Sequence, residues 1–239
     1  MELLKAQTLL LSRRKLNVSS EVSDFVGKGC LKRWQNDIWP IACQTCGKPQ
    51  GDEAFISADG LFDDDKILLS LHHGKCRGSK TTPRHEITMR IPTWAASIES
   101  RGEGEDAVPL MVVNPSCEQL MIQRPAIGRS RNVTLDIFTA IGFKSSTGTV
   151  PDLVDTMEAR LDGNRLTVAL TAKLSGETSI SAQSFTLTVS DGVRHAAQHS
   201  PFLMVAMTTK MLPLQLVELA PVFEDEDPEV VSALVPFRR

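Results

Sequence analysis

Residues 158–174 read EARLDGNRLTVALTAKL, and they indicate more about the fold than any other part of the chain. The dipeptide Asp162-Gly163 is typical of the tight turn of a β-hairpin. After this turn, every second position is apolar or small: Leu166, Val168, Leu170, Ala172 and Leu174. Since successive side chains of a strand point to opposite faces, this period of two predicts a strand with one buried face.

Similar patterns recur on both sides of this hairpin. SFTLTVS at 184–190 alternates in the same way, and other strand candidates are VPLMVV at 108–113, NVTLDIFTAIGF at 132–143 and LPLQLVEL at 212–219. Residues 132–143 also fit a helix, and residues 192–209 could hold one helix. We therefore predict an α+β protein dominated by β-strands, with an antiparallel β-rich domain over residues 81–239.

The first 40 residues are expected to form an N-terminal helical segment. Ser20 could cap a helix, and Glu21 and Asp24 suit its first turn. Gly27 interrupts the pattern soon afterwards.

The overall composition describes a folded chain without an extreme charge. Of its 239 residues, 41% are hydrophobic and 23% charged, and the net charge is -3 with a pI near 6.0. Strongly basic nucleic-acid binders have a different balance, and a chain without tyrosine has few rings on which bases could stack. We find neither a signal peptide nor an apolar run of about 20 residues, so we expect a cytoplasmic protein that does not span a membrane. Disulfides are rare in that compartment, so its cysteines are expected to be free, catalytic or metal-bound.

Two matched pairs of metal-ligand residues stand within residues 41–80. Cys43 and Cys46 are separated by two residues in IACQTCGK, and His73 and Cys76 by the same gap in HHGKC. A gap of two lets both members of a pair chelate one ion from a tight turn, and structural Zn²⁺ takes four thiolate or imidazole ligands in a tetrahedron. We therefore predict a closed structural zinc site.

This arrangement resembles a zinc-ribbon or treble-clef module of Cys3His type, over residues 41–78 only. Two short predicted strands, EAFIS at 53–57 and KILLSL at 66–71, would bring the second pair back to the first. The resemblance implies that the metal folds a segment too small for a core of its own. Residues 41–80 are thus expected to form a zinc-stapled module between the helical segment and the β-rich domain, for which no family resemblance is found.

Other interpretations of these residues remain open. His72 could replace His73 as the ligand, although neighbours on a strand point to opposite faces, which favours only one of them. Cys43 and Cys46 could form a redox pair, a function that usually needs a βαβ context. Any of the cysteines could also be a small packed residue, which is the expected role of Cys30 and Cys117.

A closed zinc site without an acid–base pair or a cofactor loop favours a non-enzymatic interaction or adaptor protein that acts within a protein or protein–nucleic-acid assembly. One alternative is a metal-dependent nuclease, because the His72-His73 pair after Cys-x-x-Cys is similar to the HNH family, in which His72 would be the general base. A second alternative is a nucleic-acid-binding regulator. The candidate contact residues for a partner or a nucleic acid are basic: Arg13, Arg14, Lys32, Arg33, Arg124, Arg129 and Arg131.

Overall fold

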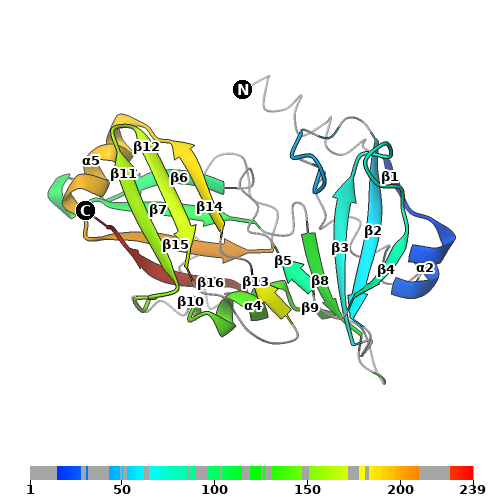
Figure 1. The fold of residues 1–239 in the computed structure, drawn as a ribbon. Coiled ribbons are helices and arrows are strands. Elements are labelled where there is room, and N and C mark those ends of the chain that lie inside the picture. Colours follow the sequence, from blue (N-terminus) through cyan, green and yellow to red (C-terminus); the bar gives the residue numbers. More distant parts are fainter. Residues whose placement is uncertain are drawn as a thin grey trace. The chain divides into compact units, whose positions relative to one another are not determined.

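Figure 1 shows the computed structural model of the chain. The residues that it describes are 15–27, 31, 43–48, 50, 53–61, 65–84, 87–89, 96–102, 104–114, 119–124, 126, 131–146, 151–171, 178–180, 183–209 and 227–238. The chain divides into two compact units, which are described separately. Unit 1 comprises residues 1–89 and 115–134, and unit 2 comprises residues 90–114 and 135–239.

Unit 1 contains a six-stranded sheet. Its order is β1 (Lys15–Asn17), β2 (Glu53–Leu61), β3 (Lys66–His72), β8 (Gln119–Gln123) and β9 (Arg131–Asn132), and β4 (Thr81–Arg84) also pairs with β2. The strand β5 (Ile87–Met89) follows β4 in the chain. The pairs β2–β3, β3–β8 and β8–β9 are antiparallel, whereas β1 and β4 run parallel to β2.

The hairpin β2–β3 is the centre of this sheet and contains both strands predicted from EAFIS and KILLSL. Phe55 is paired with His72 and Gly60 with Ile67, so β2 continues beyond the predicted end at residue 57. Every residue of β3 after Lys66 is buried. A strand buried on both faces carries a nearly continuous apolar run, which explains the sequence ILLSL.

Helix α2 (Ser20–Val26) covers one face of the sheet. The Ser19 side chain caps it by accepting a hydrogen bond from the N–H of Val22, and Gly27 ends it with a φ of 93°. Val22 and Val26 pack into a core with alternate residues of β2, β3 and β8: Ile56, Ala58, Ile67, Leu69, Leu71, Leu120 and Ile122. The predicted helical segment therefore contains a helix, with its cap one residue earlier than expected.

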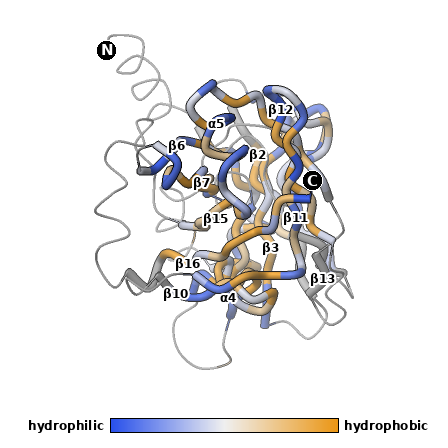
Figure 2. The backbone as a smooth tube through the Cα atoms, turned by 90° about the vertical axis from the view of Figure 1, so that its left-hand side faces the viewer, coloured by the Kyte–Doolittle hydropathy of each residue, from blue (hydrophilic) through white to orange (hydrophobic). Residues whose placement is uncertain are grey.

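Unit 2 contains a five-stranded sheet with the order β10 (Lys144–Ser146), β16 (Asp227–Pro236), β15 (Phe202–Thr208), β7 (Val108–Val113) and β6 (Ala96–Arg101). β15 is parallel to β7, and the other pairs are antiparallel. Helix α5 (Asp191–His199) packs on β6 and β7. In Figure 2 the tube is hydrophobic in colour along β7, which agrees with its sequence VPLMVV and its buried side chains.

The hairpin expected within residues 158–174 is present in unit 2. β11 (Met157–Asp162) and β12 (Arg165–Leu170) are antiparallel, and β14 (Gln183–Thr188) completes a three-stranded sheet. Asp162 is paired with Arg165, so the turn consists of Gly163, with a φ of 59°, and Asn164. The turn is therefore centred one residue later than the dipeptide Asp162-Gly163 indicated. Leu166, Val168 and Leu170 are buried as predicted, whereas residues 172 and 174 lie outside the described residues.

The prediction of a β-dominated α+β protein is confirmed. The ambiguous stretch 132–143 contains helix α4 (Thr134–Ala140), and residues 192–209 contain most of α5 followed by β15. Residues 101–106 include the short helix η1 (Gly104–Asp106), and β13 is Thr178–Ile180. The candidate strand 212–219 lies outside the described residues. Among the described residues, no helix is long and apolar enough to cross a membrane.

Candidate metal centre

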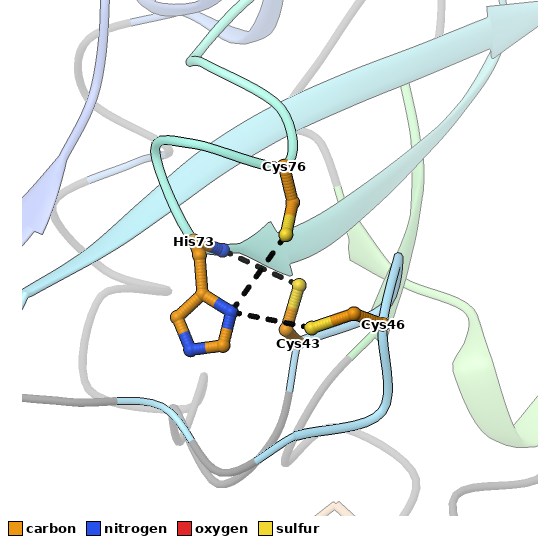
Figure 3. Close-up of side chains that lie close together, drawn as sticks. All are labelled: Cys43, Cys46, His73 and Cys76. Carbon is orange, nitrogen blue, oxygen red and sulfur yellow. Dashed lines mark hydrogen bonds between the residues drawn. The ribbon is translucent and has the colours of Figure 1, made fainter.

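Four side chains that could bind a metal ion converge at one end of the β2–β3 hairpin. They are Cys43, Cys46, His73 and Cys76, and their ligand atoms all lie within 4.8 Å of one another. Figure 3 shows His73 with its Nδ1 atom turned toward the thiols of Cys46 and Cys76. The structure thus brings together the four residues that the sequence singled out, and the histidine among them is His73 rather than His72.

The spacing of these atoms fits a tetrahedral ion. Zn–S bonds of about 2.3 Å and Zn–N bonds of about 2.0 Å place neighbouring S and N atoms of a tetrahedron about 3.5 Å apart. The His73 Nδ1 atom lies 3.4 Å from the Cys46 sulfur and 3.9 Å from the Cys76 sulfur. These two distances lie on either side of the tetrahedral value, so a zinc-sized ion could be bound with small adjustments.

The first knuckle, residues 43–48, is shaped by hydrogen bonds of its own backbone. The N–H of Gly47 donates to the carbonyl of Cys43 over 2.8 Å, and the N–H of Cys43 donates to the carbonyl of Lys48 over 2.9 Å. Gly47 has a φ of 68°, a left-handed conformation that glycine adopts without strain because it has no Cβ. The N–H of Gln44 donates to the carbonyl of Leu71 over 2.8 Å, which fixes this knuckle to the end of β3.

The second knuckle, residues 73–77, begins directly after β3. The N–H groups of Cys76 and Arg77 both donate to the carbonyl of His73, over 2.9 and 3.0 Å. At Gly74, an added Cβ would lie 2.5 Å from the ring of Phe55. The glycine thus avoids a close contact with the Phe55 ring, and its φ is not positive.

The environment of the sulfurs differs strongly within the cluster. Burial raises the pKa of Cys43, but backbone N–H groups of His73, Cys46 and Thr45 outweigh it and lower the pKa from 9.0 to about 6. One of these bonds, from the N–H of His73 to the Cys43 sulfur, measures 3.4 Å. Burial together with the neighbouring Cys46 and Cys43 raises the pKa of Cys76 to about 11. Without metal, the site therefore favours a thiolate at Cys43, and a cation would stabilise the remaining thiolates.

His72 lies outside the ligand set and is buried, with 3% of its surface exposed. Its Nδ1 atom lies 2.9 Å from the Thr45 hydroxyl, and its Nε2 atom lies 2.8 Å from the Ser70 hydroxyl. His72 thus joins the first knuckle to β3. The sequence indicated only that His72 and His73 point to opposite faces, and it did not identify Thr45. Ser70 could have been found, since residues two apart on a strand share a face.

The two basic candidate residues that the structure describes, Arg124 and Arg131, contact side chains or backbone outside the ligand cluster. Arg124 donates to the carbonyl of Phe25 at the end of α2, and its guanidinium lies 5.9 Å from the centre of the Phe25 ring. Arg131 donates to the Gln123 side chain over 2.9 Å. The other predicted contact residues, Arg13, Arg14, Lys32, Arg33 and Arg129, lie outside the described residues, as do Cys30 and Cys117.

Comparison of the chain with protein-family models, with curated proteins and with solved structures finds no match. The structure itself shows a β-dominated α+β protein with a Cys3His cluster in its N-terminal third that could hold a metal ion such as zinc.

Proposed function

We propose that the chain is a non-enzymatic zinc-binding interaction protein that acts within a protein or protein–nucleic-acid assembly. The observation that carries the proposal is the complete ligand set: four side chains offer four ligand atoms within 4.8 Å. A catalytic zinc usually keeps three protein ligands and one open position, whereas four protein ligands are typical of a structural site.

The proposed module is of zinc-ribbon type. One knuckle precedes β2 and the other follows β3, and the hairpin between them returns the chain to the ion. Zn²⁺ would be held by Cys43, Cys46, His73 and Cys76, and it would supply a fixed cross-link rather than a reaction. The two exposed turns that it holds together would then form the contact surface.

The surroundings of His72 count against the nuclease alternative. A general base needs a free nitrogen within reach of substrate, about 3 Å from the proton that it removes. Both ring nitrogens of His72 already lie within hydrogen-bond distance of hydroxyl groups, and the residue is buried. His73 is one of the four candidate metal ligands, so it would not serve as the base either.

Metal content tests the proposal directly. Elemental mass spectrometry of the purified full chain should find one zinc per molecule, and Cys43→Ser and Cys76→Ser should each lose it. Cys117→Ser, which changes a cysteine outside the cluster, is the matched control and should retain zinc. A wild-type protein purified without chelator and found free of zinc would overturn the proposal.

A cleavage assay tests the nuclease alternative separately. Zinc-loaded protein supplied with Mg²⁺ or Mn²⁺ should leave plasmid DNA intact. The opposite result would favour a nuclease over an interaction protein. It would be DNA cleavage that persists through purification and disappears in a folded His72→Ala variant.

A further inference from the structure

The two knuckles present a basic surface. We define the knuckle surface as residues 43–48 and 73–80. Lys48, Lys75 and Lys80 are exposed on it, and Arg77 is half-buried and donates to the Thr82 hydroxyl. The sequence has no acidic residue in 38–51 or 66–85. Just beyond the end of this surface, the Thr81 hydroxyl donates to the Glu21 carboxylate.

The net charge of -3 conceals an unequal distribution between the units. Unit 1 contains 16 lysines and arginines and 12 acidic residues, whereas unit 2 contains 10 and 17. Unit 1 therefore carries a net charge of +4, and unit 2 carries -7. The near-neutral total, which argues against a polyanion partner when the chain is taken as a whole, does not describe the part that holds the metal centre.

The shape and chemistry of the knuckle surface favour a polyanion over a protein partner. Interfaces between proteins depend on a few buried apolar or aromatic anchors. Among the residues that the structure describes, Leu153 of unit 2 is the exposed large hydrophobic side chain, so the knuckle surface offers no such anchor. A Cβ at Gly47 of the first knuckle, or at Gly78 just after the second, would meet nothing within 4 Å, so the backbone at these two glycines is open to a close approach. Phosphate groups need only positive charge and access.

We propose that the knuckle surface binds the phosphate backbone of nucleic acid through Lys48, Lys75 and Lys80. The inference rests on the proposed function, because the metal would join the knuckle that carries Lys48 to the knuckle that carries Lys75. Lys48 lies two residues after the ligand Cys46, and Lys75 lies between the ligands His73 and Cys76. Lysine supplies a point charge rather than a two-pronged contact, so the binding is independent of base sequence.

The strength of binding should depend steeply on salt. Each phosphate contact contributes a slope of roughly -0.9 on duplex DNA, or roughly -0.7 on a single strand, to a plot of log K against log salt concentration. Three contacts therefore predict a slope of about -2 to -3. Removal of one lysine should reduce the slope by roughly one and weaken binding equally on unrelated sequences.

The experiment uses the zinc-loaded full chain and fluorescein-labelled 30-mer oligonucleotides, with fluorescence anisotropy measured at several salt concentrations. The variants are Lys48→Gln, Lys75→Gln and the double variant. Lys144→Gln removes the same charge from unit 2 and is the matched control. The lysine variants should weaken binding and flatten the salt slope, and the control should behave as wild type. Poly-L-glutamate of similar charge serves as a mimic of an acidic protein.

Three results would overturn the inference. The first is that zinc-loaded protein fails to bind the oligonucleotides. This result would leave the structural zinc of the proposed function intact. The second is equal loss in Lys144→Gln and in the knuckle variants. The third is tighter binding to poly-L-glutamate than to nucleic acid, through the same lysines. If the protein contains no zinc, the proposed function fails as well, so metal content measured on the same samples separates the two failures.

Discussion

His72 occupies the last position of β3, next to the candidate ligand His73, yet it lies outside the Cys3His cluster. Its two ring nitrogens meet the hydroxyls of Thr45 and Ser70, so the ring connects the first knuckle to the strand that precedes the second. Residues that orient metal ligands in this indirect way contribute to metal affinity without touching the metal. We therefore regard His72 as a positioning residue.

His72→Ala should lower the affinity for zinc about 10- to 100-fold, because the first knuckle loses its side-chain connection to β3. The affinity is measured by competition with a chromophoric chelator. His72→Gln can keep a hydrogen bond to one of the hydroxyls and should recover part of the loss. If His72→Ala melts at a lower temperature but binds zinc as tightly as wild type, the residue contributes only to packing.

The pKa values of the thiols predict how zinc binding depends on pH. A thiol must lose its proton to bind zinc. At a mildly alkaline pH, Cys43 with a pKa of about 6 is already mostly thiolate, whereas Cys76 with a pKa of about 11 must release its proton. Below the pKa of about 6, Cys43 must also release a proton. Cys43 should therefore add about one unit to the slope of a plot of log zinc affinity against pH below about pH 6.

This dependence is measured by the same chelator competition from about pH 5 to about pH 8, on both sides of the Cys43 pKa, with the pH dependence of the chelator subtracted. Calorimetry in buffers of different ionisation enthalpy gives the number of protons released and serves as the control. A slope that stays constant through this range would contradict the depressed pKa of Cys43.

At the scale of single elements, the sequence predicted the kinds of element better than their ends. The cap of α2 is Ser19 rather than Ser20, and the β11–β12 turn is centred on Gly163-Asn164 rather than Asp162-Gly163. Two adjacent residues of similar chemistry offer the same local signal, and the register of the packed neighbours decides between them. The strand β4 was not predicted, because its pairing with β2 is a tertiary contact that TTPR does not encode locally.

Gly74→Ala tests the contact between the second knuckle and β2. The added Cβ would lie 2.5 Å from the Phe55 ring, so the ring or the knuckle must move, at a cost of about 1–3 kcal/mol. Urea denaturation of the zinc-loaded protein measures the loss. Gly78→Ala is the matched control, since a Cβ there meets nothing within 4 Å, and it should be nearly neutral.

A double variant identifies the cause of that loss. If the Phe55 ring is the obstacle, Gly74→Ala should cost much less stability in a Phe55→Leu background than in the wild-type background, as a double-mutant cycle would show. Equal losses from Gly74→Ala with and without the ring would point to the backbone of the knuckle instead.

At the scale of the whole molecule, the ligand set could be predicted but the topology could not. The four ligands come in two pairs with a local spacing that carries its own chemical meaning. By contrast, β3 pairs with β8 across about 50 residues of sequence, and β15 is parallel to β7 across more than 90. Such pairings depend on which apolar faces remain available after local elements form, which no short stretch records. The domain boundaries predicted at residues 40 and 80 stay a prediction.

Removal of the metal should affect the two units unequally. Hydrogen exchange measured by mass spectrometry, before and after treatment with a chelator, should show lost protection at the amides of Gln44, His73 and Cys76. The amides shared by β7 and β15 in unit 2 should be unchanged, because all four candidate ligands belong to unit 1. Uniform loss over both units would show that the metal stabilises more than the knuckles, and no loss at all would show that it stabilises nothing.

The position of the knuckles at the open end of a hairpin also bears on how the chain folds. The β2–β3 pairing is local and brings residue 73 back toward residue 43 before any ion is needed. An ion that then joins Cys43 to Cys76 closes a loop of 32 intervening residues. An ion that binds after the hairpin has formed adds bonds that are absent from the transition state for folding. Zinc should therefore lengthen the lifetime of the folded knuckles without speeding their formation.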